Sequence, residues 1–133
     1  MTSMQKLLLT GFEPFLSNPF NPTMDIVKAL DGKILGNYEV VGRVLAVDFK
    51  QAPTQFLTLI EEVQPAIIVS LGLAAGSTKI SPERVAINVK DGEKDNSGNA
   101  FLDAPIHEDG DVAYFSTLPI RQIVNRLNEA GYP

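Results

Sequence analysis

The sequence contains no cysteine and only one histidine, His107. The absence of cysteine excludes disulfide bonds, thiolate metal sites and a cysteine nucleophile supplied by these residues. A single histidine cannot build a histidine-based metal cluster. We therefore expect no bound metal ion, and we expect no cofactor.

The chain also lacks an excess of positive charge. Its 11 Lys and Arg residues against 16 Asp and Glu residues give a formal net charge of −5 at pH 7. A protein that binds nucleic acid needs a basic face to displace counterions. The charge balance therefore argues against a nucleic-acid partner.

Long apolar runs are missing as well. The apolar stretch near the N-terminus, Leu7 to Leu9, is much shorter than the core of a secretion signal or a membrane span. We therefore expect a cytoplasmic protein with no membrane partner.

The residues that are present predict one folded domain. The 133 residues are 44% hydrophobic and 20% charged, which is typical of a globular chain rather than a disordered one. We expect residues 1–133 to form a single α/β domain.

Three stretches are predicted to be strands. Residues 7–10 and 66–71 are apolar without alternation, which favours central parallel strands covered on both faces. Residues 38–49 mix valines with Glu39 and Arg43, as expected for a partly exposed strand nearer an edge.

Three amphipathic stretches are predicted to be helices. Apolar residues recur at helical spacing in residues 56–63 and 120–127, and residues 24–30 form a shorter candidate. Proline and glycine residues flank these stretches, as they do at helix ends. The alternation of strands and helices predicts a three-layer α/β sandwich with a mixed, mainly parallel central sheet.

The connection after the strand at 66–71 carries a prediction about direction. Residues 73–82 are too few for a parallel crossover, so we expect the apolar run 85–89 to be antiparallel to that strand. This reversal would bring Glu83 to the edge where Phe12 and Phe15 follow the first strand. Open α/β sheets bind ligands at that edge.

Glu83 is the candidate catalytic carboxylate. Alternation along a strand would place it on the apolar face of Val85 and Ile87, away from Arg84. A carboxylate on an apolar face needs a hydrogen-bond donor, and a functional histidine is one natural partner. The alternative is a structural glutamate held by backbone N–H groups or by a distant lysine.

Phe12 and Phe15 are the candidate substrate-binding residues. They lie three residues apart in a loop stiffened by Pro14, where two rings can wall a flat apolar slot. The alternative is that both rings simply fill the end of the core.

Other polar features are weaker candidates. Residues 72–77 lack the ending of a phosphate-binding P-loop, and His107 lies in an acidic stretch typical of a solvated loop. We also expect a solvated surface for seven irregularly spaced carboxylates. They are Asp91, Glu93, Asp95, Asp103, Glu108, Asp109 and Asp111.

Several motifs then coincide in order along the chain. They are Gly11-Phe12-Glu13-Pro14-Phe15, Asn21-Pro22, Ser70-Leu71-Gly72-Leu73-Ala74, Pro82-Glu83-Arg84-Val85-Ala86-Ile87-Asn88, Asp95-Asn96 and Ala113-Tyr114-Phe115-Ser116-Thr117-Leu118-Pro119. Together they resemble the pyrrolidone-carboxylate peptidases, also called pyroglutamyl peptidase I, from about Leu7 to Pro133.

The resemblance implies a cytoplasmic cysteine peptidase that removes N-terminal 5-oxoproline from peptides with a Cys-His-Glu triad, commonly as a homotetramer. It implies that Glu83 is the triad glutamate and that Phe12 and Phe15 surround the oxoproline ring. The partner would be an N-terminally pyroglutamylated peptide.

The chain departs from the family pattern in three ways. It ends at Pro133, before the segments that supply the family's cysteine and histidine. Leu73 replaces a glutamine-like residue, and residues 92–96 form a shortened segment that lacks an arginine. We therefore expect an incomplete family member, with the C-terminal part of the fold missing and no hydrolytic activity.

Two other hypotheses remain. The chain could be an inactive pyroglutamyl-binding module or pseudoenzyme. It could also be an unrelated α/β enzyme, similar to a nucleoside phosphorylase, that binds phosphate at residues 72–77.

Overall fold

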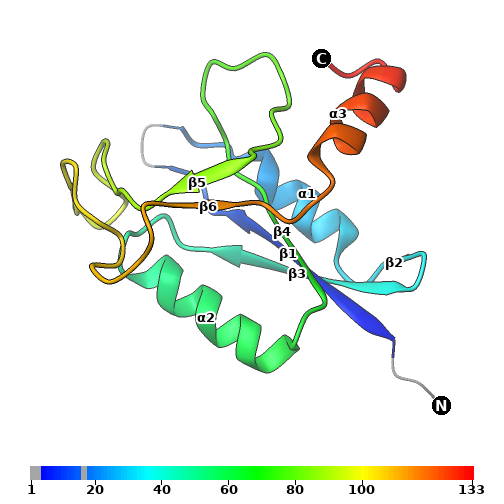
Figure 1. Ribbon diagram of the computed structural model, residues 1–133, viewed down its shortest axis with the longest axis horizontal. Coiled ribbons are helices and arrows are strands. Elements are labelled where there is room, and N and C mark those ends of the chain that lie inside the picture. The colour runs from blue at the N-terminus through cyan, green and yellow to red at the C-terminus, as the bar shows by residue number, and fades with distance from the viewer. Residues whose placement is uncertain (1–3, 16–17) are drawn as a thin grey trace. The chain divides into compact units, whose positions relative to one another are not determined.

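The computed structural model describes residues 4–15 and 18–133. Within these residues, three helices are interspersed among six strands along the chain (Figure 1). Their order is β1 (Gln5–Phe12), α1 (Pro22–Leu30), β2 (Ile34–Leu35), β3 (Tyr38–Leu45), α2 (Gln51–Val63), β4 (Ile67–Ser70), β5 (Val85–Ile87), β6 (Ala113–Phe115) and α3 (Ile120–Glu129).

The chain divides into two compact units. The first contains the residues up to Leu73 together with Lys94–Asn99, and the second contains Ala74–Glu93 and Ala100–Pro133. The prediction of a single domain stays a prediction.

The first unit is built on a four-stranded sheet in the order β2-β3-β1-β4. β1 is parallel to both β3 and β4, and the short β2 is antiparallel to β3. The register places Leu8 opposite Val41 on one side and Ile68 on the other. The predicted mixed, mainly parallel sheet is confirmed.

Helices cover both faces of this sheet (Figure 1). Val27 of α1 packs with Leu9 and Val40 in the buried core on one face. Because side chains alternate along a strand, Leu45 points to the other face, where it lines a pocket with Phe56 of α2. The first unit therefore has the three layers that the sequence predicted.

Two glycines allow α1 to approach the sheet closely. A Cβ atom added to Gly42 would lie 2.7 Å from the backbone oxygen of Val27, and one added to Gly11 would lie 2.8 Å from that of Thr23. Such distances leave no room for a side chain at either position. The helix can seat here only because both residues are glycine.

The sheet differs from the sequence-based expectation in two places. β4 was expected to be central, but it lies at the edge of the four-stranded sheet in the described part of the chain. β3 stops at Leu45 instead of continuing to Phe49, because the backbone of residues 47–49 forms other hydrogen bonds, described below. The expectation that β3 lies near an edge is met, since only β2 lies outside it.

The helices match their predicted positions, with longer ends. α1 begins at Pro22 rather than Met24, because Asn21 caps it. α2 begins before Phe56, at Gln51, and ends at Val63, and Gln64 follows in a left-handed conformation with φ of 52°. This conformation and Pro65 both terminate the helix.

The second unit contains a two-stranded sheet and α3. β5 pairs antiparallel with β6, with Ala86 opposite Tyr114. Because β5 pairs with β6 and belongs to a different unit from β4, its direction relative to β4 stays a prediction. No helix among the described residues is long and apolar enough to cross a membrane.

Candidate functional site

The loop that carries the two candidate phenylalanines follows directly from β1. Phe12 is the last residue of the strand, and its backbone N–H donates to Thr23 Oγ1 at 2.9 Å. The next N–H, of Glu13, donates to the carbonyl of Leu45 at 3.0 Å. Phe12 and Phe15 are both half-buried. The loop therefore leaves the sheet in a defined direction, with both rings partly accessible.

The start of α1 holds the same loop. Asn21 is buried, and its Oδ1 accepts hydrogen bonds from the backbone N–H of Thr23 at 3.0 Å and from Thr23 Oγ1 at 2.7 Å. Its Nδ2 donates to the carbonyl of Glu13 at 3.2 Å. Asn21 therefore caps the helix and ties it to the loop after β1.

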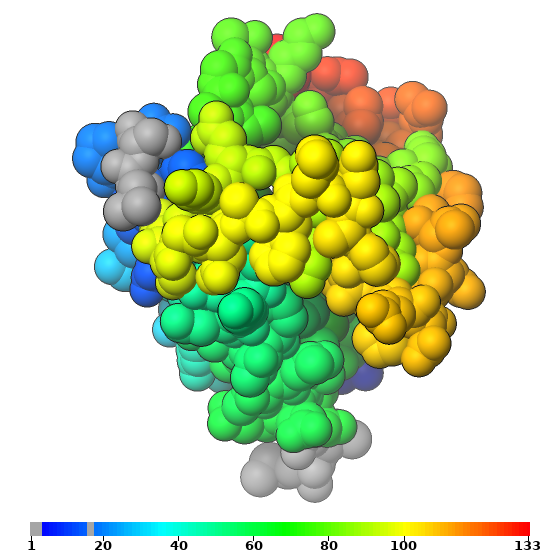
Figure 2. All heavy atoms as spheres, turned by 90° about the vertical axis from the view of Figure 1, so that its left-hand side faces the viewer, coloured from blue at the N-terminus to red at the C-terminus, as the bar shows by residue number. Residues whose placement is uncertain are grey.

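The segment 94–99 lies against the beginning of α2, and Figure 2 shows its yellow-green atoms over the teal atoms of that region. Asp95 was expected on a solvated surface, but only 3% of it is exposed. Its side chain accepts hydrogen bonds from the backbone N–H groups of Phe49, Ser97 and Asn99. Backbone donors replace the water that such a carboxylate loses on burial.

Both buried carboxylates of this region have a lowered pKa. Burial alone would raise the pKa of Asp95, but its hydrogen bonds from Phe49, Asn99 and Ser97 bring that pKa below the usual value. Hydrogen bonds from the Ser97 side chain and the backbone of Gln51 lower the pKa of Asp48. Both groups are therefore ionised at neutral pH and serve as hydrogen-bond acceptors.

Glu83 belongs to the second unit and is exposed. It precedes β5, which begins only at Val85, so strand alternation does not decide its direction. This corrects the expectation that Glu83 opens the strand. No hydrogen bond or ion pair to its carboxylate occurs among residues 4–15 and 18–133. Because Phe12 and Phe15 lie in the first unit, their convergence with Glu83 stays a prediction.

His107 is exposed, as expected of a loop residue. Asn88 holds its backbone, with Oδ1 accepting from the N–H of His107 at 2.9 Å and Nδ2 donating to its carbonyl at 2.8 Å. Within the part of the chain that the structure describes, no group of three or more His, Cys, Asp or Glu side chains is arranged to hold a metal ion.

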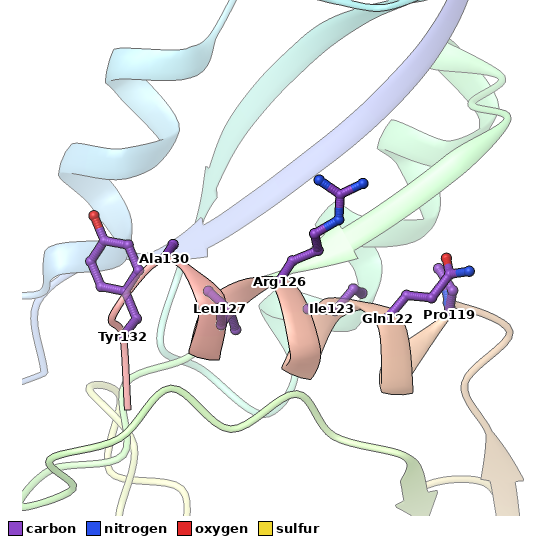
Figure 3. Close-up of a pocket in the computed structure, with 7 residues that line it drawn as sticks. All are labelled: Pro119, Gln122, Ile123, Arg126, Leu127, Ala130 and Tyr132. Carbon is purple, nitrogen blue, oxygen red and sulfur yellow. The ribbon is translucent and has the colours of Figure 1, made fainter.

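Two pockets lie elsewhere in the units. One, of about 370 Å³, runs along α3, and Figure 3 shows that its lining residues all come from this helix and its flanks. The other, of about 260 Å³, lies between α2 and the sheet. Neither pocket is lined by Phe12, Phe15 or Glu83.

Sequence reasoning missed the contributions of Asn21 and Asn96. The signal for Asn21 was an asparagine directly before Pro22, which is typical of a helix N-cap followed by a proline in the first turn. For Asn96, whose side chain donates to the carbonyl of Pro14, no local signal exists because its partner is 82 positions away.

Comparison with known proteins places this geometry in context. The family model described as pyroglutamyl peptidase matches residues 5–133. The pyrrolidone-carboxylate peptidase of Lysinibacillus sphaericus (strain C3-41) is 57% identical over 124 residues, which cover 93% of this chain and 61% of that protein. The corresponding protein of Halalkalibacterium halodurans is 51% identical over 127 residues, covering 96% of this chain and 63% of that protein.

A solved structure agrees closely with the fold. The pyrrolidone carboxyl peptidase from Thermococcus litoralis superposes with a TM-score of 0.95 at 44% identity, covering 98% of this chain and 60% of that one. The chain thus spans about three-fifths of the length of the relatives that it matches.

Proposed function

Because the chain belongs to the pyroglutamyl peptidase family, we propose that it forms part of a cysteine peptidase that removes N-terminal pyroglutamyl groups from peptides. The match over residues 5–133 is the observation that carries this proposal. It also argues against an unrelated phosphate-binding enzyme. The expected homo-oligomer and the cytoplasmic location stay predictions.

In this proposal Phe12 and Phe15 bind the pyroglutamyl ring. The ring is a flat, uncharged lactam without a free amine, so aromatic faces suit it and an acidic pocket for an amine would not. The two residues are half-buried on a loop that hydrogen bonds tie to both β3 and α1. A held loop presents the rings without a large loss of conformational entropy on binding.

Glu83 would act on the histidine of the triad. In the reaction that the resemblance implies, a thiolate attacks the pyroglutamyl carbonyl carbon, and the histidine protonates the departing amine. A carboxylate beside the histidine orients the ring and stabilises its protonated form. Glu83 is exposed, which leaves its carboxylate accessible to such a partner.

We further propose that these 133 residues alone do not hydrolyse the substrate. They contain no cysteine, and their only histidine is outside the family's histidine motif. Removing the nucleophile and the base together abolishes most of the catalysis of acyl transfer. The second candidate is a pyroglutamyl-binding module without activity, which Leu73 in place of a glutamine-like residue supports.

Hydrolysis and binding can be tested on the same protein. We expect no release of a fluorescent amine from a pyroglutamyl amide reporter, but saturable binding of a pyroglutamyl peptide measured by calorimetry. The same peptide with an N-terminal proline should bind more weakly, because it carries a charged amine. Turnover by the chain would contradict the inactivity, and absence of binding would contradict the ring slot.

A phenylalanine variant tests the slot itself. Phe12→Ala should weaken binding of the pyroglutamyl peptide about 3- to 10-fold, which corresponds to the loss of one aromatic contact. Phe20→Ala is the matched control, because Phe20 is 61% exposed and follows residues 12–15 later in the same β1–α1 connection. Equal affinities of the two variants would exclude Phe12 from the slot. A reading frame that continues beyond Pro133 into a cysteine-containing strand would favour the peptidase over the module.

A further inference from the structure

The loop after β1 is held through hydrogen bonds to its own main-chain N–H and carbonyl groups. The N–H of Glu13 is bonded to Leu45 at 3.0 Å, and the carbonyl of Glu13 is bonded to Asn21 at 3.2 Å. Pro14 has no N–H, so its backbone can be held only through its carbonyl. That carbonyl accepts a hydrogen bond from Nδ2 of Asn96 at 3.0 Å. Asn96 therefore holds the loop at Pro14, next to Phe15, while Leu45 and Asn21 hold it at Glu13.

Asn96 can reach the loop because its own backbone is fixed. Its N–H donates to the carbonyl of Val47 at 2.9 Å, at the point where β3 has ended. Asp95, next to it, accepts from the N–H of Phe49 at 2.7 Å and from the N–H of Asn99 at 2.8 Å. These bonds close residues 95–99 into a tight turn and attach the turn to the start of α2. The side chain of Asn96 therefore extends from a rigid base.

We propose that Asn96 is a positioning residue that fixes the loop of residues 12–15 and, if the proposed function is right, sets the placement of the two rings that bind the pyroglutamyl group. Asn96 does not contact the substrate in this proposal. It acts through the carbonyl of Pro14, between Phe12 and Phe15. Asp95 supports it by holding the turn from which Asn96 projects.

The first measurement needs no ligand. Asn96→Asp keeps the size of the side chain but replaces the Nδ2 donor with an acceptor that faces the carbonyl of Pro14. We expect the backbone N–H of Glu13 to exchange with solvent about 2- to 10-fold faster, the factor that corresponds to one lost hydrogen bond. The ring signals of Phe15 in the NMR spectrum should shift as well.

Asp31→Ala is the matched control for this measurement. It removes the hydrogen bond that Asp31 Oδ1 accepts from the backbone N–H of Gly42 at 2.8 Å, together with the 3.6 Å ion pair between Asp31 and Arg43, but at the opposite end of α1. It should leave exchange at Glu13 unchanged. Unchanged exchange in Asn96→Asp, or equal acceleration in the control, would overturn the proposal.

The second measurement is the affinity for the pyroglutamyl peptide. Asn96→Asp should weaken binding by a similar factor of about 2 to 10, whereas Asp31→Ala should bind as the unchanged chain does. Normal affinity despite faster exchange would show that Asn96 does not position the rings. If the unchanged chain binds no pyroglutamyl peptide, the proposed function fails, and the exchange of Glu13 alone decides whether Asn96 fixes the loop.

Discussion

Replacing Gly11 with alanine should disturb both the stability of the first unit and the loop that follows β1. The added Cβ would lie 2.8 Å from the backbone oxygen of Thr23 and 2.9 Å from its Oγ1. Backbone oxygen cannot move aside as a flexible side chain can, so α1 must shift away from the strand. That shift would lengthen the hydrogen bond from the N–H of Phe12 to Thr23 Oγ1, which is 2.9 Å long.

The expected change in the free energy of unfolding is the sum of opposing contributions. Overpacking of this kind costs about 1–3 kcal/mol, and a weakened hydrogen bond adds about 0.5–1.5 kcal/mol. The lower entropy of alanine in the unfolded chain offsets about 0.4–1 kcal/mol. We therefore expect Gly11→Ala to lower the free energy of unfolding by about 1–3 kcal/mol.

Urea unfolding followed by far-ultraviolet circular dichroism measures this change. Gly72→Ala is the matched control, because a Cβ at Gly72 meets nothing within 4 Å and its φ lies outside the left-handed region. The control should be as stable as the unchanged chain, or slightly more stable. If Gly11→Ala unfolds at the same urea concentration as Gly72→Ala, the close approach of α1 to β1 does not constrain this position.

Two further predictions concern buried groups of the first unit. Asp48 and Asp95 have a pKa below the ordinary value of 3.8, so their stabilisation is present above that pH and is lost as the pH falls through the folded-state values. Asp48→Asn combined with Asp95→Asn should flatten the acid limb of a plot of unfolding free energy against pH; an unaltered limb would contradict this assignment. Leu9→Ala should cost about 2–5 kcal/mol in urea unfolding because Leu9 is only 5% exposed, whereas Leu57→Ala, at a position 63% exposed, should stay within about 0.5 kcal/mol. Equal losses in these two leucine variants would mean that the core is not centred on β1.

The elements that the sequence predicted correctly depend on local patterns. The period of apolar residues in 56–63 and 120–127 identifies helices because side chains three and four positions apart share a face. The unbroken apolar run at 7–10 identifies the central strand because both of its faces are covered. The motifs around Phe12, Phe15 and Glu83 also lie in short stretches, and they led to the family that the comparisons support.

The misplaced features depend on contacts between distant residues. β4 was expected to be central because its residues are apolar, but within the part of the chain that the structure describes it pairs only with β1 and lies at the edge of the four-stranded sheet. Glu83 was expected to open a strand, but β5 is limited to the three residues that pair with β6. In both cases pairing between strands decided the outcome, and pairing leaves little trace in the sequence of a single strand.

The sequence by itself determined the helices, the central parallel strand and the family, because each of these is encoded within a short window of neighbouring residues. Only the tertiary structure decided that Asp95 is buried and that Asn96 holds the carbonyl of Pro14, 82 positions earlier. In the sequence, a carboxylate or an amide among other polar residues looks the same whether its hydrogen-bond partners are water molecules or protein groups. Their hydrogen-bond partners exist only once the folded backbone brings β1, β3 and the start of α2 together.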